Sequence, residues 1–302
     1  MIDELIARVN NWGRWGKDDQ LGTLNFITPE RIAAAAKLVR SGRLIELGVP
    51  WDSEGPQATA PRRYNPIHFM DQLPVDLRLP GDVGVADDVM VVPLQAISQW
   101  DSLAHVSFRR RIYNDHSEDM VTSHGAQINS IREISGKVAG RGILADFPSE
   151  LGVDHLEEGY AITAEDLDRN FAVRGITPQA GDILLVRTGF MRLCRDRAWQ
   201  GYHGDAPGMG LSAIDWLHDH DIAAIATDTA SLEVKPFDAE GIGVPFHAVA
   251  IVHMGLLLGE IFDFEELSEA CLEDGRFEFF FVAPPMPVTA GVGSPVNPYA
   301  FK

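Results

Sequence analysis

The sequence predicts a single α/β domain over residues 1–302, with a mixed, largely buried β-sheet and flanking helices. Short apolar runs at 142–147, 182–188 and 222–228 are typical of strands that are buried on both faces. Helical segments alternate with these runs, and neither internal repeats nor low-complexity linkers interrupt them. This alternation favours one sheet covered by helices, so no domain boundary is predicted.

The order of the elements follows from end signals and apolar patterns along the chain. Helices are expected at 29–42 (cap Thr28, stop Gly42), 164–173 (cap Thr163), 213–221 (cap Ser212), 248–259 (after His247) and 264–275 (cap Asp263, stop Gly275). Further strands are expected at 44–49, 89–95 and 276–285. Residues 52–87 contain many Pro, Gly and Asp residues, which predicts a long irregular excursion near the N-terminus.

The chain is strongly acidic, with Lys+Arg 25 against Asp+Glu 44 and a formal net charge of -19 at pH 7. This balance disfavours nucleic-acid binding, which depends on basic contacts to phosphate, and an anionic membrane surface would repel the chain. No stretch reaches the roughly 18 apolar residues of a spanning helix, and the N-terminus lacks the features of a secretory signal. We therefore expect a cytoplasmic protein that binds a small molecule and neither nucleic acid nor a membrane.

Several common chemical motifs are absent. Cys194 and Cys271 form no CxxC pair, which excludes a disulfide scaffold and a cysteine-only zinc site. The patterns GxSxG, GxxxxGK[ST], GxGxxG and HExxH do not occur, which disfavours serine hydrolysis and nucleotide chemistry. Histidine and carboxylate residues remain as the candidates for chemistry.

Asp101 and His105 form the first candidate site, directly after a predicted strand. Residues four apart on a helical turn share a face, so the carboxylate and the imidazole would lie together. Both groups are good ligands for a divalent metal such as zinc. The alternative is an Asp that caps a helix beside a packed histidine.

His247 and Glu260 form the second candidate site. His247 opens the apolar helix expected at 248–259, and Glu260 follows the end of that helix, so a kink or loop would be needed to return the carboxylate. Apolar residues flank Glu260, and a buried carboxylate needs a partner, a cation or a proton. An ordinary ion pair is the alternative. His253 is interpreted as a packing residue.

Asp228 is the third candidate, because it ends a buried strand and active sites of open α/β sheets lie off such ends. A turn-forming Asp is an equally good interpretation. His68 lies in the irregular excursion, where binding residues are frequent. The basic triplet at 109–111 could recruit a substrate carboxylate, but salt bridges to the acidic surface are favoured.

A resemblance that no single segment carries extends over nearly the whole chain. It rests on the segments 11–16, 21–30, 99–106, 113–114, 140–144, 181–189, 226–234, 245–260 and 291–298. With them the chain resembles the cyclase family of metal-dependent hydrolases, which includes bacterial kynurenine formamidase and isatin hydrolase. The resemblance implies a kynurenine formamidase-like fold and a homodimer or homotetramer. It maps the family's later histidine and glutamate onto His247 and Glu260 and supports metal ligation by Asp101 and His105.

The chain departs from the formamidase pattern His-x-Gly-Thr-His-x-Asp-x-Pro-x-His. Aligned on the second histidine, Asp101 replaces the first His, His105 matches the second, Ser107 replaces the Asp, and Arg109 and Arg111 replace the Pro and the last His. The longer members with a WGRWG segment look similar to this chain. The departures favour one metal ion over two and argue against kynurenine formamidase activity.

The resemblance and the candidate residues predict a hydrolase with one divalent ion, Zn or Mn, that activates water to open a small cyclic amide or lactone, or to cleave an N-acyl aromatic amide. Glu260 or Asp228 is the expected general base and His247 or His68 the expected acid. Substrate contacts are expected from His68, Gln99, Trp100 and Tyr113. A metal-dependent dehydratase or isomerase, and a metal-free binder of a small acid, are the alternatives.

Overall fold

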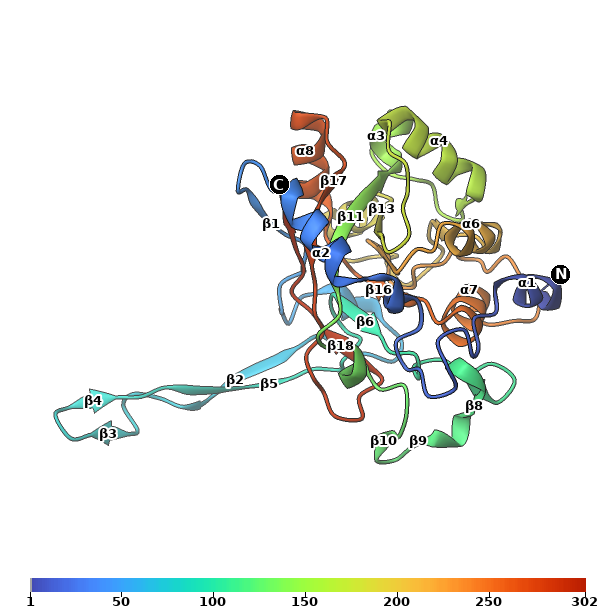
Figure 1. Cartoon of the computed structure of the whole chain (residues 1–302). Helices are drawn as coiled ribbons and strands as arrows, with labels where there is room; N and C mark the ends of the chain where they lie inside the picture. Colours follow the sequence, from blue (N-terminus) through green and yellow to red (C-terminus); the bar gives the residue numbers. More distant parts are fainter. Residues whose placement is uncertain (1) are drawn as a thin grey trace.

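The computed structural model describes residues 2–302 and is organised around one nine-stranded sheet (Figure 1). From edge to edge, the strands are β1 (Leu44–Glu46), β19 (Tyr299–Phe301), β17 (Glu278–Val282), β11 (Ala139–Asp146), β13 (Ile183–Arg187), β15 (Ala224–Thr227), β16 (Leu257–Glu260), β6 (Gln99–Asp101) and β18 (Gly293–Pro295). β11, β13, β15 and β16 are parallel, and the other neighbours pair antiparallel. The mixed α/β sheet that the sequence predicts is confirmed.

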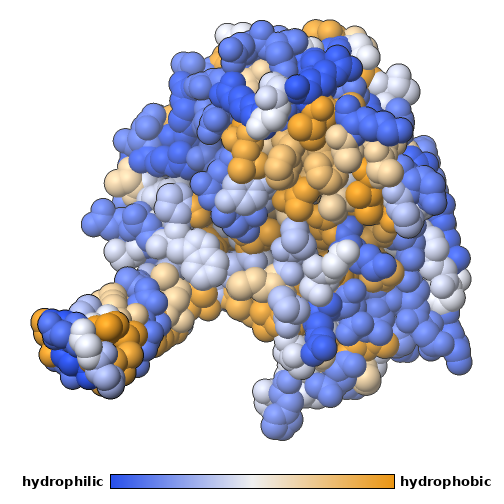
Figure 2. Space-filling view, turned by 60° about the vertical axis from the view of Figure 1, so that its left-hand side comes forward, coloured by the Kyte–Doolittle hydropathy of each residue, from blue (hydrophilic) through white to orange (hydrophobic). Residues whose placement is uncertain are grey.

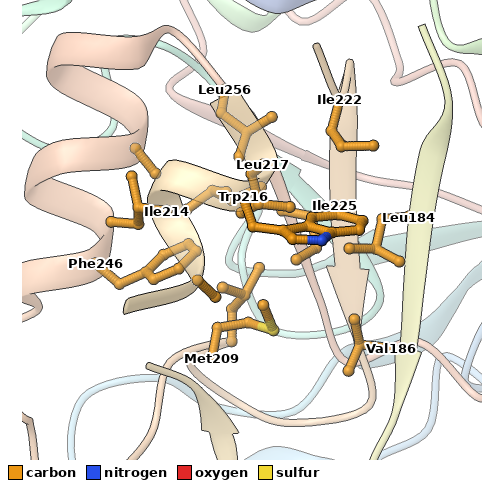
Figure 3. Packing of buried hydrophobic residues seen from close by; sticks show 14 of the residues in the cluster. Leu184, Val186, Met209, Ile214, Trp216, Leu217, Ile222, Ile225, Phe246 and Leu256 are labelled. Atoms are coloured by element: carbon orange, nitrogen blue, oxygen red, sulfur yellow. The ribbon is translucent and has the colours of Figure 1, made fainter. Parts of the chain in front are cut away.

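Helices cover the sheet, whose two faces bury separate apolar cores. The helices are α1 (Ile2–Val9), α2 (Pro29–Ala35), α3 (Phe147–Leu151), α4 (Ala164–Arg174), α5 (Phe190–Asp196), α6 (Ile214–Asp219), α7 (Pro245–Val249) and α8 (Glu265–Asp274). Leu184 and Val186 of β13 belong to the core with α6 and α7 (Figure 3). Leu185 belongs to the core with α8 on the other face. Strands buried on both faces explain the continuous apolar runs. No helix within residues 2–302 is long and apolar enough to cross a membrane.

The capping signals were right for some helices and wrong for others. Thr28 caps α2, Thr163 forms a capping box at α4, and Gly275 ends α8 in the left-handed region. Gly42 does not end the first helix, which stops at Ala35 and is followed by a 3₁₀ turn at Ala36–Leu38. Ser212 caps nothing, because it lies inside the 3₁₀ turn Leu211–Ala213 that precedes α6.

The helix expected at 248–259 is the most consequential error. After α7 the chain continues as one π-helical turn, Ala250–Met254, and then leaves the helix at Gly255, whose φ is 70°. A Cβ at Gly255 would lie 2.4 Å from the ring of Tyr113, so a larger residue does not fit there. The apolar run that follows is strand β16, which carries Glu260 back into the sheet.

Residues 52–87 are less irregular than the sequence predicts. Their second half contributes to a hairpin of β2 (Ile67–Gln72) and β5 (Asp87–Val91), with the short strands β3 (Arg78–Leu79) and β4 (Val83–Gly84) at its tip. This arm, residues 67–91, stands away from the body (Figure 1). The strand expected at 89–95 therefore belongs to the arm through β5 and not to the main sheet.

The arm exposes many large apolar side chains, visible among hydrophilic ones in Figure 2. They are Ile67, Phe69, Met70, Leu73, Val75, Leu77, Leu79, Val83, Met90 and Val91. An isolated two-stranded hairpin is marginally stable in water. A homo-oligomer, as the sequence resemblance implies, would supply a cover for these side chains.

Charged residues placed on the arm are therefore expected to weaken the association between copies of the chain. The variants Phe69→Glu and Met90→Glu place a carboxylate where an apolar contact between copies is expected, which should weaken assembly about tenfold or more. Light scattering coupled to size-exclusion chromatography measures the effect. Val173→Glu on α4 is the matched control, because Val173 is 64% exposed and lies outside the arm. A wild-type monomer, or arm variants with wild-type mass, would contradict this expectation.

Candidate metal centre

The pairing of β6 with β16 places three polar side chains on one face of the sheet. Gln99 lies opposite Glu260 and Asp101 opposite Leu258, so Gln99, Asp101 and Glu260 share the face of the core that contains α7. Trp100 lies on the other face opposite Gly259, where an added Cβ would meet the Trp100 ring at 2.6 Å. The glycine therefore lets the tryptophan pack and keeps the two strands in this register.

α7 brings His247 to the same place. The N-cap position of α7 is Val244, which has no side chain that can cap the helix. The carboxylate of Glu233, distant in sequence, does so instead and accepts a hydrogen bond of 2.9 Å from the backbone N–H of Phe246. The same carboxylate bonds Nδ1 of His247. Nε2 of His247 is thereby left for the centre of the site.

Asp101, His247 and Glu260 come together as a buried triad. Nε2 of His247 lies 3.2 Å from a Glu260 oxygen and 3.9 Å from an Asp101 oxygen. One potential ligand atom from each residue lies within 4.8 Å of the others. The second Glu260 oxygen accepts a hydrogen bond of 2.7 Å from the Gln99 side chain. The three residues are 1%, 4% and 4% exposed, in chain order.

His105 stands at the rim of this triad. Its Nε2 lies 3.7 Å from the other Asp101 oxygen, and its side chain is 22% exposed. The expected proximity of the two residues is present, but its cause differs from the expected helical turn. Asp101 ends strand β6, and a tight turn in which the His105 amide bonds the Ser102 carbonyl brings the imidazole back.

Several buried polar atoms around the triad have no hydrogen-bond partner within residues 2–302, and they show whether a cation would fit there. Both carboxylate oxygens of Asp101, Oε1 of Gln99 and Nδ1 of His105 are buried and have no hydrogen-bond partner among the described residues. A buried ionised carboxylate without donors is costly, whereas a coordinated cation satisfies it. The mixed oxygen and nitrogen ligands suit zinc or manganese. The residues present therefore fit one divalent metal ion.

The electrostatics of the triad agree with this fit. Burial, together with the charge of Glu260, raises the pKa of Asp101. Burial also opposes ionisation of Glu260, but the hydrogen bond and charge of His247 prevail and lower the pKa of Glu260. Burial disfavours the charged His247, yet Glu233 and Glu260 together raise the pKa of His247 to about 10. Without a metal, the site therefore holds a proton on this histidine.

Asp228 has a structural role, as the alternative interpretation held, but its partners lie on a neighbouring strand end and not in a local turn. It accepts hydrogen bonds from the backbone N–H and hydroxyl of Thr188 and from the N–H of Gly189, all between 2.7 and 3.1 Å. These bonds join the ends of β13 and β15. Burial raises the pKa of Asp228 to about 6. Its oxygens are occupied, so its assignment as a general base is corrected.

Three expected substrate contacts are also corrected. Trp100 is fully buried in the core on the opposite face, and its indole N–H donates to the Ala283 carbonyl. Tyr113 is buried and donates its hydroxyl to Asp19 at 2.9 Å. His68 lies on the exposed arm and pairs with Asp88 at 2.8 Å, and it makes no hydrogen bond or ion pair with the triad in the described part of the chain. Each residue was predicted from its type and neighbours, which do not reveal the face on which a side chain lies.

Two residues acquire roles at the triad that residue type alone did not indicate. Gln99 was expected to bind substrate, but its amide instead holds Glu260. Glu233 was not singled out at all, although the missing capping residue before Pro245 was a signal that a distant acceptor is needed. His253 packs against Trp12 with ring centroids 4.8 Å apart, as expected. Arg109, Arg110 and Arg111 pair with surface carboxylates, again as expected.

Comparisons with known proteins agree with this architecture. The profile of a family described as "Putative cyclase" matches residues 45–234. A crystal structure described as a novel cyclase has a TM-score of 0.89 and 35% sequence identity, covering 98% of this chain and 99% of that one. No curated protein matches the chain.

Two more distant structures share the fold. Isatin hydrolase A from Labrenzia aggregata, bound to benzyl benzoate, has a TM-score of 0.64 at 15% identity, covering 85% of this chain and 93% of that one. A "predicted metal-dependent hydrolase" from Bacillus stearothermophilus has a TM-score of 0.54 at 14% identity, covering 85% and 97%. The fold expected from the sequence resemblance is therefore confirmed.

Metal uptake is expected to release a proton from His247. Because the pKa of this histidine is raised to about 10, a metal must displace its proton at neutral pH. The association constant should therefore fall up to about tenfold per pH unit as the pH decreases. Calorimetry of zinc or manganese binding in buffers of different ionisation enthalpy counts the released protons.

Glu233→Gln isolates the cause of this pH dependence. Loss of the carboxylate lowers the pKa of His247, so the variant should release fewer protons on metal binding, and its metal affinity should depend less on pH. Glu240→Gln, at an exposed position, is the control. A metal affinity independent of pH would contradict the assignment, as would equal proton release from wild type and Glu233→Gln.

Proposed function

The chain belongs to the putative cyclase family, and we propose that it is a metal-dependent hydrolase that opens a small cyclic amide or lactone, or cleaves an N-acyl aromatic amide. The observation that carries the proposal is the buried carboxylate of Asp101, which lies beside His247 and Glu260 and has no hydrogen-bond partner among the described residues. The likeness to an isatin hydrolase and to a "predicted metal-dependent hydrolase" supports it.

Asp101, His247 and Glu260 would hold the metal, with His105 at the rim. When bound, a divalent metal supplies a Lewis acid for the substrate carbonyl and lowers the pKa of water. Glu233 keeps Nε2 of His247 directed into the site by bonding Nδ1. Gln99 fixes one oxygen of Glu260 and leaves the other beside His247. Glu233 and Gln99 thereby hold His247 and Glu260 in the orientation that metal binding requires.

Proton transfer is assigned to His105. Hydrolysis breaks the C–N or C–O bond of the substrate, adds the oxygen of water to the carbonyl carbon and places a proton on the leaving nitrogen or oxygen. Asp101 and Glu260 are fully enclosed, whereas the His105 side chain is 22% exposed and its Nε2 lies 3.7 Å from an Asp101 oxygen. His105 can therefore exchange protons between the site and solvent.

Loss of the Asp101 charge is expected to abolish turnover. Asp101→Asn removes a metal ligand, so its activity should fall about a hundredfold or more at limiting metal, and a chelator should inactivate the wild type until metal is restored. Hydrolysis of a panel of aromatic lactones and cyclic amides provides the assay. Asp18→Asn, at an exposed position, is the control. Turnover that resists chelation would contradict the proposal.

Product analysis in isotope-labelled water separates hydrolysis from the alternatives. A hydrolase places the water oxygen in the new carboxylate of the product. A dehydratase or isomerase on the same centre forms no labelled carboxylate, and a binding protein forms no product.

A further inference from the structure

One hollow of the surface, lined by none of the metal-holding residues, carries an excess of basic side chains. Its lining consists of Gln57, Ala60, Pro61, Arg62, Arg63, His203 and Lys235, without any carboxylate. Three of these seven residues are Arg or Lys, in a chain whose formal net charge is -19. Such a local reversal of charge in a concave site attracts an anionic ligand.

Two segments of the chain link residues of this hollow to residues of the metal centre. Lys235 lies two residues after Glu233, the residue that holds His247, so their Cα atoms are at most about 7 Å apart. Arg63 donates to the carbonyl of Gln95 at 2.9 Å, and Gln57 donates to the carbonyl of Ala96 at 2.7 Å. Both carbonyls belong to the segment that leads directly into β6. The hollow is therefore linked through the backbone to the strand and the carboxylate that form the site.

The charges in the hollow also act on the buried carboxylates. Burial pushes the pKa values of Asp101 and Glu260 upward, and the charge of Arg63 is among those that push them downward. Burial lowers the pKa of Lys235, while the charges of Glu260 and Glu233 oppose that effect. Arg63 and Lys235 thus lie within electrostatic reach of the metal-holding carboxylates.

The side chains of Lys235 and Arg63 both have N–H groups that are free to bind a ligand. The ammonium group of Lys235 has no hydrogen bond and no ion pair within residues 2–302, although the side chain is partly buried. One guanidinium nitrogen of Arg63 donates to the Gln95 carbonyl, and the other two make no hydrogen bond within residues 2–302. An arginine fork matches the two oxygens of a carboxylate, and a neighbouring lysine adds a point charge. The arginines at 109–111, in contrast, are neutralised by surface carboxylates.

We propose that the substrate carries a carboxylate that Arg63 and Lys235 bind, while its scissile carbonyl lies at the centre formed by Asp101, His247 and Glu260. This inference rests on the proposed function and narrows it to cyclic amides, lactones or acyl amides of small acids. The hollow binds the part of the substrate that does not react, so it sets specificity and orientation.

A matched substrate pair tests the proposal with the metal-loaded, full-length protein. A carboxyphthalide, an aromatic lactone with a free carboxylate, is compared with its neutral methyl ester. The wild type should prefer the acid. At saturating metal, Lys235→Gln and Arg63→Gln should each raise KM for the acid about tenfold or more, the value of a charge-assisted hydrogen bond, and should change KM for the ester much less. Lys37→Gln, at an exposed position, is the control.

The outcomes distinguish this inference from the proposed function. Equal kinetics for acid and ester, or equal losses on both substrates in the variants, would overturn the carboxylate site while the hydrolase activity stands. If neither lactone is hydrolysed, the same two compounds are compared by calorimetry. Binding of the acid that is lost in both variants then supports the hollow although the reaction assignment fails, whereas no binding of the acid overturns it.

Discussion

The interaction on which the site depends is the enclosure of two carboxylates, Asp101 and Glu260, around a single histidine. Glu233 adds a third buried carboxylate on the other side of His247. Ionised groups lose their hydration when buried, and the loss must be offset by partners of opposite charge. His247, even with His105 3.7 Å from Asp101, does not balance three carboxylates, and the oxygens of Asp101 have no hydrogen-bond donor within residues 2–302. A divalent cation resolves both deficits at once.

The fold is arranged to maintain this enclosure. Gly255 ends the helical segment that carries His247, and Gly259 admits the Trp100 ring, so β16 returns beside β6 in the register that sets Glu260 opposite Gln99. The Asp228 hydrogen bonds tie neighbouring strand ends together next to the site. Interiors pack densely, so small residues at these two positions decide where the larger groups lie. The scaffold thereby holds side chains from distant parts of the chain within ligand distance.

Much of this arrangement was predictable from residues, and the reasons for the remainder are physical. Apolar runs and caps such as Thr163 are local signals, and they predicted the sheet and several helices. The pairing partner of a strand is not a local property, so Trp100 could not be assigned to the opposite face from Asp101. The helix over 248–259 was wrong because its apolar pattern suits a buried helix and a buried strand equally. The excursion over 52–87 was predicted, but its hairpin was not, since the exposed strands have no buried face that would show an apolar alternation.

The central claim is that Asp101, His247 and Glu260 hold one divalent metal ion. The most direct measurement is a crystal structure of protein loaded with zinc or manganese, with data collected on both sides of the absorption edge of the metal. The account predicts a single anomalous peak bonded to one oxygen of Asp101, Nε2 of His247 and one oxygen of Glu260. It would be contradicted by crystals soaked in excess metal that show no peak there, or by a peak held by other residues.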